Sequence, residues 1–321
     1  MVGVRPDPAH PISQGYACLK GMAVPAYQND PDRLVRPERR ITGGFADVPW
    51  DEAIADIGAR LKRIRAEHGP TSIATYWGNA ADSVSITLAN TFCHSFGSPN
   101  SFNVLSLEYT DRGAVAARMF GNENFILQPD AGRSSYALLI GTNPIVTQGM
   151  TLLQRRPRIA ADFKAVQRRG GKIVVVDPRR TESVRLADEH VAILPGTDLF
   201  FLLGLLRRIF DRGAVNAQFV ATHCSGLREL EAALAGVELA TVARVTGLAR
   251  EHIERIAEEF AAAPSAFATT RVGVQTSWNT TLTEWAVQCL NTVTGNIDRP
   301  GGVYFNPGAI DVPALIAQFT K

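Results

Sequence analysis

The sequence has few cysteines, and no two of them lie close together. Its 321 residues contain only Cys18, Cys93, Cys224 and Cys289. Because no C-x-x-C pair is present, the chain has neither the cysteine spacing of a disulfide framework nor a complete local metal site. This usage is consistent with a reducing compartment, and we expect a cytoplasmic protein.

Excess charge of one sign and long hydrophobic runs are also lacking. Lysine and arginine total 33 against 31 acidic residues, a net charge of +2, so nothing favours nucleic acid or an anionic membrane as a partner. No run of about 18 apolar residues occurs, and the first residues lack the charged start and apolar core of a signal peptide. We therefore expect no nucleic-acid partner and no membrane span.

Two common nucleotide-binding motifs are missing as well. The chain contains neither a G-x-G-x-x-G fingerprint nor a G-x-x-x-x-G-K-[ST] loop. These absences argue against an ordinary NAD-dependent dehydrogenase and against a P-loop enzyme. The chain is nevertheless 45% hydrophobic and long enough for one large core or two smaller ones.

Strand-like and helix-like segments alternate along most of the chain. The proline-rich residues 1–40 suit an irregular or short-stranded segment. Beyond them, short apolar runs predict strands at 72–77, 136–140, 172–176, 191–194 and 266–270. Apolar residues at three- and four-residue spacing predict helices from Trp50 to Gly69, at 83–96, 150–169, 199–211 and 282–294, and several between 215 and 263. The alternation predicts an α/β fold with mostly parallel sheets flanked by helices.

Polar turns follow the predicted strands. They are residues 78–79, 141–144, 177–181, 196–198 and 271–275. In parallel sheets, ligands bind beyond the carboxyl ends of the strands. Glycines there permit close backbone approach, Arg179 and Thr181 are able to bind phosphate oxygens, and Asp198 is able to accept the paired N–H donors of a guanine edge. Together these turns predict a nucleotide site.

Several short motifs follow one another along the chain: Gly15–Gly21, Asn29–Leu34, Trp50–Ala53, Gly141–Pro144, Val176–Arg179, Pro195–Asp198 and Thr294–Gly302. Taken in this order, they resemble the molybdopterin oxidoreductase family, which includes dimethyl sulfoxide reductase, formate dehydrogenase and nitrate reductases. The resemblance covers nearly the whole chain, and the ordered set is much more specific than any one of its members.

The resemblance implies a bis(molybdopterin guanine dinucleotide) cofactor with molybdenum or tungsten, held between Rossmann-like domains. It also implies oxygen-atom or hydride transfer with a small-molecule substrate, and electron flow through a [4Fe–4S] cluster to a redox partner protein or subunit. Cys18 resembles a cluster ligand, and Lys20 resembles the lysine between cluster and pterin. The positions that resemble the family's dinucleotide pocket are Asn79, Gly141, Asn143, Asp177, Arg179, Thr181, Gly196, Asp198, Gly273 and Gln275.

The sequence departs from the family pattern at both ends. The family takes three cluster cysteines from a C-x₂-C-x₃-C run that does not occur here, and its enzymes continue well beyond the segment that resembles Thr294–Gly302. We therefore expect an enzyme fragment that is inactive alone. The implied domains are an iron–sulfur remnant at 1–42, a first α/β domain at 43–115 plus 290–321, and a second at 116–289.

The loop that should carry the metal's protein ligand, residues 101–113, contains no cysteine. Glu108 lies nearest the position of the family's cysteine or selenocysteine, while Ser106 and Asp111 are the nearest residues of an accepted ligand type. The absence of an obvious ligand leaves an alternative open. The chain could be a catalytically inactive electron-transfer or scaffold subunit that keeps the fold.

Overall fold

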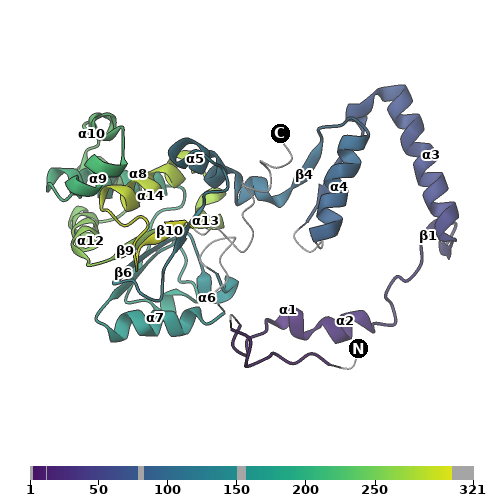
Figure 1. Ribbon diagram of the computed structural model, residues 1–321, viewed down its shortest axis with the longest axis horizontal. Coiled ribbons are helices and arrows are strands. Elements are labelled where there is room, and N and C mark those ends of the chain that lie inside the picture. Colours follow the sequence, from purple (N-terminus) through teal and green to yellow (C-terminus); the bar gives the residue numbers. More distant parts are fainter. Residues whose placement is uncertain (1–2, 12, 79–82, 150–156, 306–321) are drawn as a thin grey trace. The chain divides into compact units, whose positions relative to one another are not determined.

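The computed structural model describes residues 3–11, 13–78, 83–149 and 157–305. The chain divides into two compact units, residues 1–106 and 107–321 (Figure 1). Among the described helices, none combines the length and the apolarity that crossing a bilayer requires.

The first unit consists of short elements around two longer helices. Its elements are α1 (Leu19–Met22), α2 (Val24–Gln28), β1 (Glu38–Ile41), β2 (Gly44–Asp47), α3 (Trp50–His68), η1 (Pro70–Ser72), β3 (Thr75–Trp77), α4 (Ser83–Ser95), β4 (Ser101–Asn103) and η2 (Val104–Leu107). Strands β1 and β2 form an antiparallel hairpin, and β3 pairs with β4 in parallel.

Two expectations for this unit need correction. The proline-rich start contains two short helices, since Pro25 lies in the first turn of α2, where its missing N–H is not needed. The strand predicted at 72–77 is shorter, because 70–72 form a 3₁₀ turn, and its apolar run is not covered, since Tyr76 is 77% exposed. The helix predicted from Trp50 is confirmed as α3.

A four-stranded parallel sheet forms the centre of the second unit. Its order is β8 (Glu189–Val191), β7 (Lys172–Val176), β6 (Tyr136–Ile140) and β9 (Ala266–Thr270). Three of these strands match the prediction. The fourth lies at Glu189–Val191 instead of 191–194, and it ends early because Ile193 N–H donates back to Val191 O and stops the pairing with β7.

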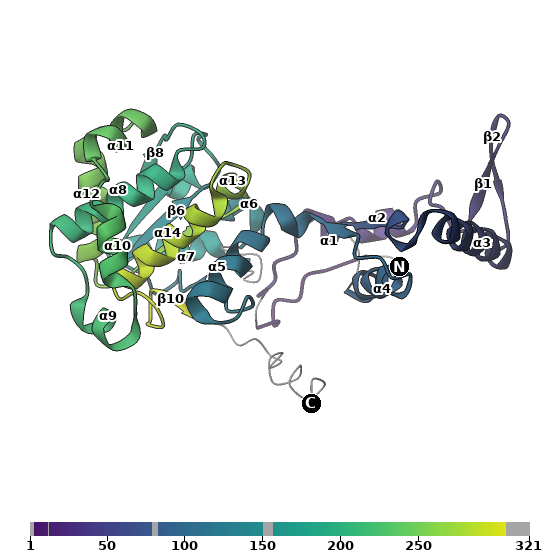
Figure 2. The same cartoon turned by 90° about the horizontal axis from the view of Figure 1, so that it is seen from above.

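Helices cover both faces of this sheet. The remaining elements of the unit are α5 (Thr110–Phe120), β5 (Leu127–Pro129), α6 (Pro144–Thr147), α7 (Ile159–Arg168), η3 (Val184–Leu186), α8 (Asp198–Asp211), α9 (Ala217–His223), α10 (Leu227–Leu234), α11 (Leu239–Thr246), α12 (Arg250–Ala262), α13 (Val272–Gln275), α14 (Thr280–Val293) and β10 (Val303–Phe305). Helix α7 lies on one face, whereas α8, α12 and α14 lie on the other (Figures 1 and 2).

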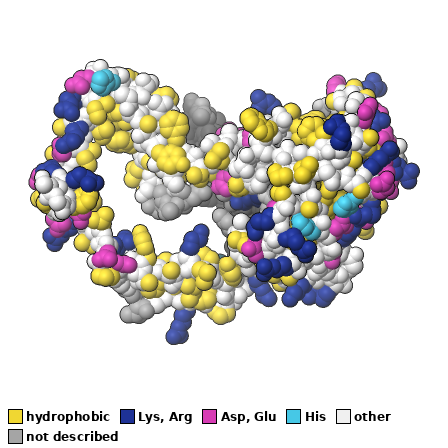
Figure 3. All heavy atoms as spheres, turned by 180° about the vertical axis from the view of Figure 1, so that it is seen from behind, with side chains coloured by type: hydrophobic (Ala, Val, Ile, Leu, Met, Phe, Trp, Pro, Cys, Tyr) yellow, Lys and Arg dark blue, Asp and Glu magenta, His cyan; other side chains and the backbone are white. Residues whose placement is uncertain are grey.

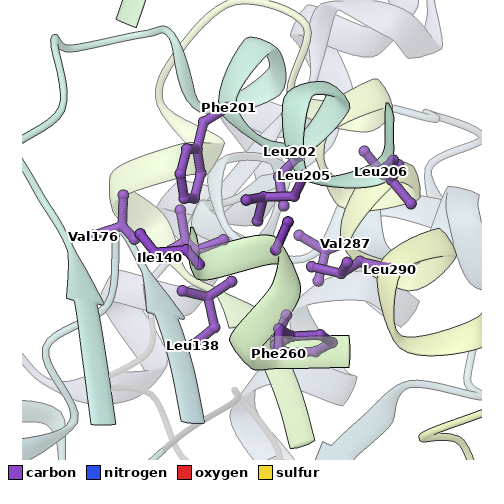
Figure 4. Packing of buried hydrophobic residues seen from close by; sticks show 14 of the residues in the cluster. Leu138, Ile140, Val176, Phe201, Leu202, Leu205, Leu206, Phe260, Val287 and Leu290 are labelled. Atoms are coloured by element: carbon purple, nitrogen blue, oxygen red, sulfur yellow. The ribbon is translucent and has the colours of Figure 1, made fainter. Parts of the chain in front are cut away.

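Alternate residues of β6 enter the two cores, as the strand period of two requires. Leu138 and Ile140 pack against α8 and α14, whereas Ala137 and Leu139 face α7. Figure 4 shows Ile140 next to Phe201 of α8, with Leu138 on the far side of Ile140. The mostly parallel α/β architecture predicted from the sequence is therefore confirmed for this unit.

The outer edge of β9 is closed by side-chain amides. Asn291 accepts from Ala268 N–H at 2.9 Å and donates to Ala268 O at 3.0 Å, and Asn296 accepts from Ala266 N–H at 3.0 Å. These amides satisfy backbone groups that would otherwise be open to pairing with another strand. The asparagine of the segment Thr294–Gly302, Asn296, is therefore needed to satisfy the backbone at the edge of β9.

The C-terminal described residues belong with the second unit, which differs from the predicted domains. Leu290 and Val293 of α14 lie in the core above the sheet, and β10 pairs antiparallel with β5. The prediction grouped 290–321 with 43–115, yet residues 290–305 pack with the second unit because their apolar side chains complete its cores.

Candidate cofactor-binding site

The loops after β6 and β9 touch through two glycines. Gly273 N–H donates to Gly141 O at 3.1 Å, and Gly141 has a φ of +58°. A Cβ on Gly273 would lie 2.7 Å from Gly141 O, and one on Gly141 would lie 2.8 Å from Val274 N. Both predicted positions therefore need glycine, because the two backbones meet at the carboxyl edge of the sheet.

Asn143 joins the loop after β6 to the loop after β7. Its Nδ2 donates to Glu182 Oε2 at 2.7 Å, and its Oδ1 accepts from Ser183 N–H at 3.2 Å and from Ser183 Oγ at 2.7 Å. The hydrogen bond from Asn143 lowers the pKa of Glu182. In this structure Asn143 holds two loops of the site together.

Asp177 and Arg179 form the turn directly after β7. Asp177 Oδ1 accepts from Arg179 N–H at 2.9 Å, which fixes the backbone of the turn. The Arg179 side chain is 65% exposed, with Nη2 3.6 Å from Glu182 Oε2. This weak exposed pair leaves the guanidinium accessible to an anionic ligand.

Several buried polar atoms at this edge have no hydrogen-bond partner within the described part of the chain. They are Thr142 Oγ1, Thr181 Oγ1, and both Nε2 and Oε1 of Gln275. All three residues are at most 5% exposed. Leaving such a group unsatisfied costs roughly 1–3 kcal/mol, so these atoms fit a polar ligand. Thr142 was not among the predicted residues, although its position between Gly141 and Asn143 could have indicated it.

Asp198 is a buried carboxyl group in the first turn of α8. Burial, with a smaller contribution from the charge of Asp177, raises its pKa to about 6, although the Asp198 backbone N–H opposes the shift. The preceding Gly196 has a φ of +78°, with open space where a Cβ would be. The turn before α8 thus brings a carboxyl group near the loop after β7.

The start of the second unit brings two of the candidate metal-ligand residues to the same edge. Glu108 Oε2 lies 3.7 Å from Arg271 Nη2, directly after β9, and both side chains are at most 14% exposed. Asp111 Oδ1 accepts from Thr281 Oγ1 at 2.7 Å, at the start of α14. Ser106 ends the first unit, where its exposed hydroxyl donates to Asn103 O at 3.2 Å.

The candidate cluster residues lie in the first unit. Cys18 and Lys20 are exposed, and Cys18 immediately precedes α1. Hydrogen bonds from the backbone N–H groups of Gly21 and Lys20 lower the pKa of the Cys18 thiol. Within the described ranges, no three histidine, cysteine, aspartate or glutamate side chains gather as a metal site. The predicted pocket residue Asn79 lies outside the described residues.

A family model described as molybdopterin oxidoreductase matches residues 33–319, and the chain belongs to this family. It is 26% identical over 309 residues to the assimilatory nitrate reductase catalytic subunit of Bacillus subtilis. It is 29% identical over 309 residues to the thiosulfate reductase molybdopterin-containing subunit of Salmonella typhimurium. Both alignments include 94% of this chain but only 41% and 39% of the relatives, so the chain spans about two fifths of their length.

A solved structure supports the fold. The acetylene hydratase of Pelobacter acetylenicus superposes with a TM-score of 0.79 at 23% identity, over 92% of this chain and 40% of that one. Membership of the family implies a molybdenum or tungsten molybdopterin cofactor. The unpartnered amide of Gln275 and the hydroxyls of Thr142 and Thr181 fit such a polar ligand.

Proposed function

We propose that this chain is the cofactor-holding part of a bis(molybdopterin guanine dinucleotide) oxidoreductase that oxidises or reduces a small substrate. The observation that carries the proposal is the buried Gln275 amide at the carboxyl edge of a parallel sheet, because its two polar atoms have no hydrogen-bond partner among the described residues. A bound dinucleotide would satisfy these atoms at the place where such sheets bind ligands.

Each loop then has its own role in binding. Gln275, Thr142 and Thr181 would hydrogen-bond the cofactor, and the exposed Arg179 guanidinium would bind its phosphate oxygens. The Asp198 carboxyl group would accept N–H donors of the guanine. The bound cofactor supplies redox chemistry at its metal, and this chain's residues hold and orient it.

Electron transfer belongs to the same proposal. Cys18 would contribute one ligand to a [4Fe–4S] cluster, and Lys20 would supply positive charge close to it, which stabilises a reduced cluster. The lowered pKa of Cys18 favours the thiolate that binds iron. Electrons would then pass to a redox partner protein or subunit.

A second candidate is a catalytically inactive electron-transfer or scaffold subunit. One observation favours it: the segment 101–113 contains no cysteine, and Asp111 Oδ1 already accepts a hydrogen bond from Thr281 Oγ1. Metal analysis separates the two functions. Iron without molybdenum or tungsten in the purified full-length protein would support the scaffold.

The test of the cofactor site is Gln275→Leu in the full-length protein that contains this chain. We expect the bound pterin, measured by fluorescence after oxidation, to fall at least about tenfold, as for loss of a buried ligand contact. The cofactor-free protein should be as stable as the wild type or more so, because an unsatisfied buried amide is removed.

Gln218→Leu is the matched control, because Gln218 is exposed on α9. It should retain normal pterin content. Normal pterin content in Gln275→Leu, or a wild-type protein purified without pterin, would contradict the proposed function.

A further inference from the structure

Two ion pairs of opposite polarity connect the segment 107–113 to its neighbours, which are the residue directly after β9 and helix α14. In one pair, Glu108 of the segment faces Arg271, the residue directly after β9. In the other, Arg112 of the segment faces Glu284 of α14. The segment therefore contributes the acid to one pair and the base to the other.

The Arg112–Glu284 ion pair is deeply buried, and each of the two side chains is hydrogen-bonded to other residues. Arg112 Nε lies 3.6 Å from Glu284 Oε2, and each side chain is 4% exposed. Arg112 Nη2 donates to the backbone oxygen of Thr270 and, at 2.8 Å, to its hydroxyl. Arg112 thus binds the last residue of β9 directly.

Glu284 is held from two further sides. The Thr270 hydroxyl donates to Glu284 Oε2, and Gln288 Nε2 donates to Glu284 Oε1 at 2.8 Å. A buried charge is tolerated only when it is paired and hydrogen-bonded. This network fixes the start of α5 against the carboxyl end of β9.

The Glu108–Arg271 pair lies next to the residues that we assign to the cofactor. Arg271 precedes Gly273 by two positions and Gln275 by four, on the loop whose backbone meets Gly141. Its side chain is 10% exposed and that of Glu108 is 14% exposed, so solvent screens the pair little. Glu108 is therefore held by the same loop that carries Gln275.

We propose that Arg112 and Arg271 are positioning residues: Arg112 fixes the segment 107–113 on β9, and Arg271 orients the Glu108 carboxylate toward the bound cofactor. The inference rests on the proposed function and deepens it. It assigns to this segment a carboxylate, an oxygen donor, instead of a thiolate. Ser106 and Asp111 are left out because their hydrogen bonds, to Asn103 O and from Thr281 Oγ1, are solvent-exposed, whereas the Glu108 side chain is 14% exposed.

The experiment compares Arg271→Met, Arg271→Lys, Glu108→Gln and the charge swap Glu108→Arg/Arg271→Glu in the full-length holoenzyme. Pterin content, melting temperature and the electron paramagnetic resonance signal of the pentavalent metal are recorded for each. We expect pterin to be retained, because the residues assigned to hydrogen-bond it, Thr142, Thr181 and Gln275, are unchanged in these variants. Residues that orient a metal's surroundings typically change activity about 10- to 100-fold when replaced, and we expect Arg271→Met and Glu108→Gln to lose activity on this scale.

The metal signal separates positioning from simple stabilisation. It should shift in Arg271→Met and Glu108→Gln and be largely restored in Arg271→Lys. The charge swap should recover the melting temperature but not the wild-type signal, because the carboxylate then lies on the wrong residue. For Arg112, Arg112→Lys should keep the signal, whereas Arg112→Met should broaden it.

Arg208→Met is the control, because Arg208 pairs with Glu258 on α12, outside this network. It should lower the melting temperature slightly without changing the signal. An unchanged signal in Glu108→Gln, or full recovery of the signal in the charge swap, would overturn the positioning role while leaving the proposed function intact. Failure of the proposed function is recognised separately, as a wild-type protein without pterin.

Discussion

The two units of the chain form clear helices and strands, but only the second encloses a large core. In the first unit, the buried hydrophobic residues among those described are Ile73 and Cys93, whereas the second unit has two extended clusters. On α3, Trp50 is 64% exposed and Ile54 is 62% exposed. Figure 3 shows hydrophobic side chains on the surface of the first unit. Regular elements alone therefore do not produce a core.

The difference lies in the sheets. A four-stranded parallel sheet with helices on both faces buries every residue of β6 and β9. The described strands β3 and β4 form a two-stranded sheet, whose Tyr76 and Phe102 are more than half exposed. Two strands alone bury little, and their side chains are covered only where other elements pack on them, as on β5 of the second unit, which is fully buried.

The largest expected effect comes from removing a core side chain. Phe260→Ala should destabilise the second unit by about 3–5 kcal/mol, because Phe260 is fully buried beside the sheet. Ile54→Ala on α3 should change stability by less than about 0.5 kcal/mol. Urea unfolding of both variants checks the comparison, and equal losses would contradict it.

Replacing a glycine by alanine should have smaller effects on stability, and these effects should differ in sign between the two units. Gly273→Ala should destabilise by about 1–3 kcal/mol, because its Cβ would meet Gly141 O. Gly58→Ala in α3, where no atom lies within 4 Å of the new Cβ, should stabilise by roughly 0.5–1 kcal/mol. Thermal melting of the two variants measures the sign. Destabilisation by Gly58→Ala would show that the first unit is packed more tightly than described.

The smallest effect concerns acid sensitivity. Burial raises the pKa of Glu189, but hydrogen bonds from Arg255, Lys172 and His252 outweigh it and lower the pKa to about 2. Stability from this group is present above the unfolded-state pKa of 4.5 and is lost as the pH falls toward 2. Allowing for solvent screening, Glu189→Gln should cost about 1 kcal/mol at pH 7 and less below pH 4.

The matched change in the first unit is Asp56→Asn. Asp56 pairs with Arg60 on the exposed surface of α3, and the hydrogen bond from Arg60 lowers its pKa. No measurable change in stability is expected at either pH. Unfolding curves at pH 7 and pH 3 test both variants, and a cost for Glu189→Gln that grew at low pH would reverse the assigned sign.

Local patterns predicted much of the second unit, because strand and helix periods are properties of neighbouring residues. The strands at 136–140, 172–176 and 266–270 match β6, β7 and β9. The turns that follow them were also recognisable, since Gly141 and Asp177 are residues typical of turns. Burial in the first unit was not predictable in this way, because periodicity shows which side chains share a face and not whether anything covers it.

The sequence by itself determined the order of elements, the α/β class and the turns at the carboxyl ends of the strands. Tertiary structure alone decided how distant residues combine there. Arg112 binds Thr270 across 158 positions, and the backbones at Gly141 and Gly273 meet because β6 and β9 are neighbours in the sheet. The local sequence pattern does not indicate which distant residues pair in this way. They depend on which strands lie side by side, and that is settled only when the whole core is packed.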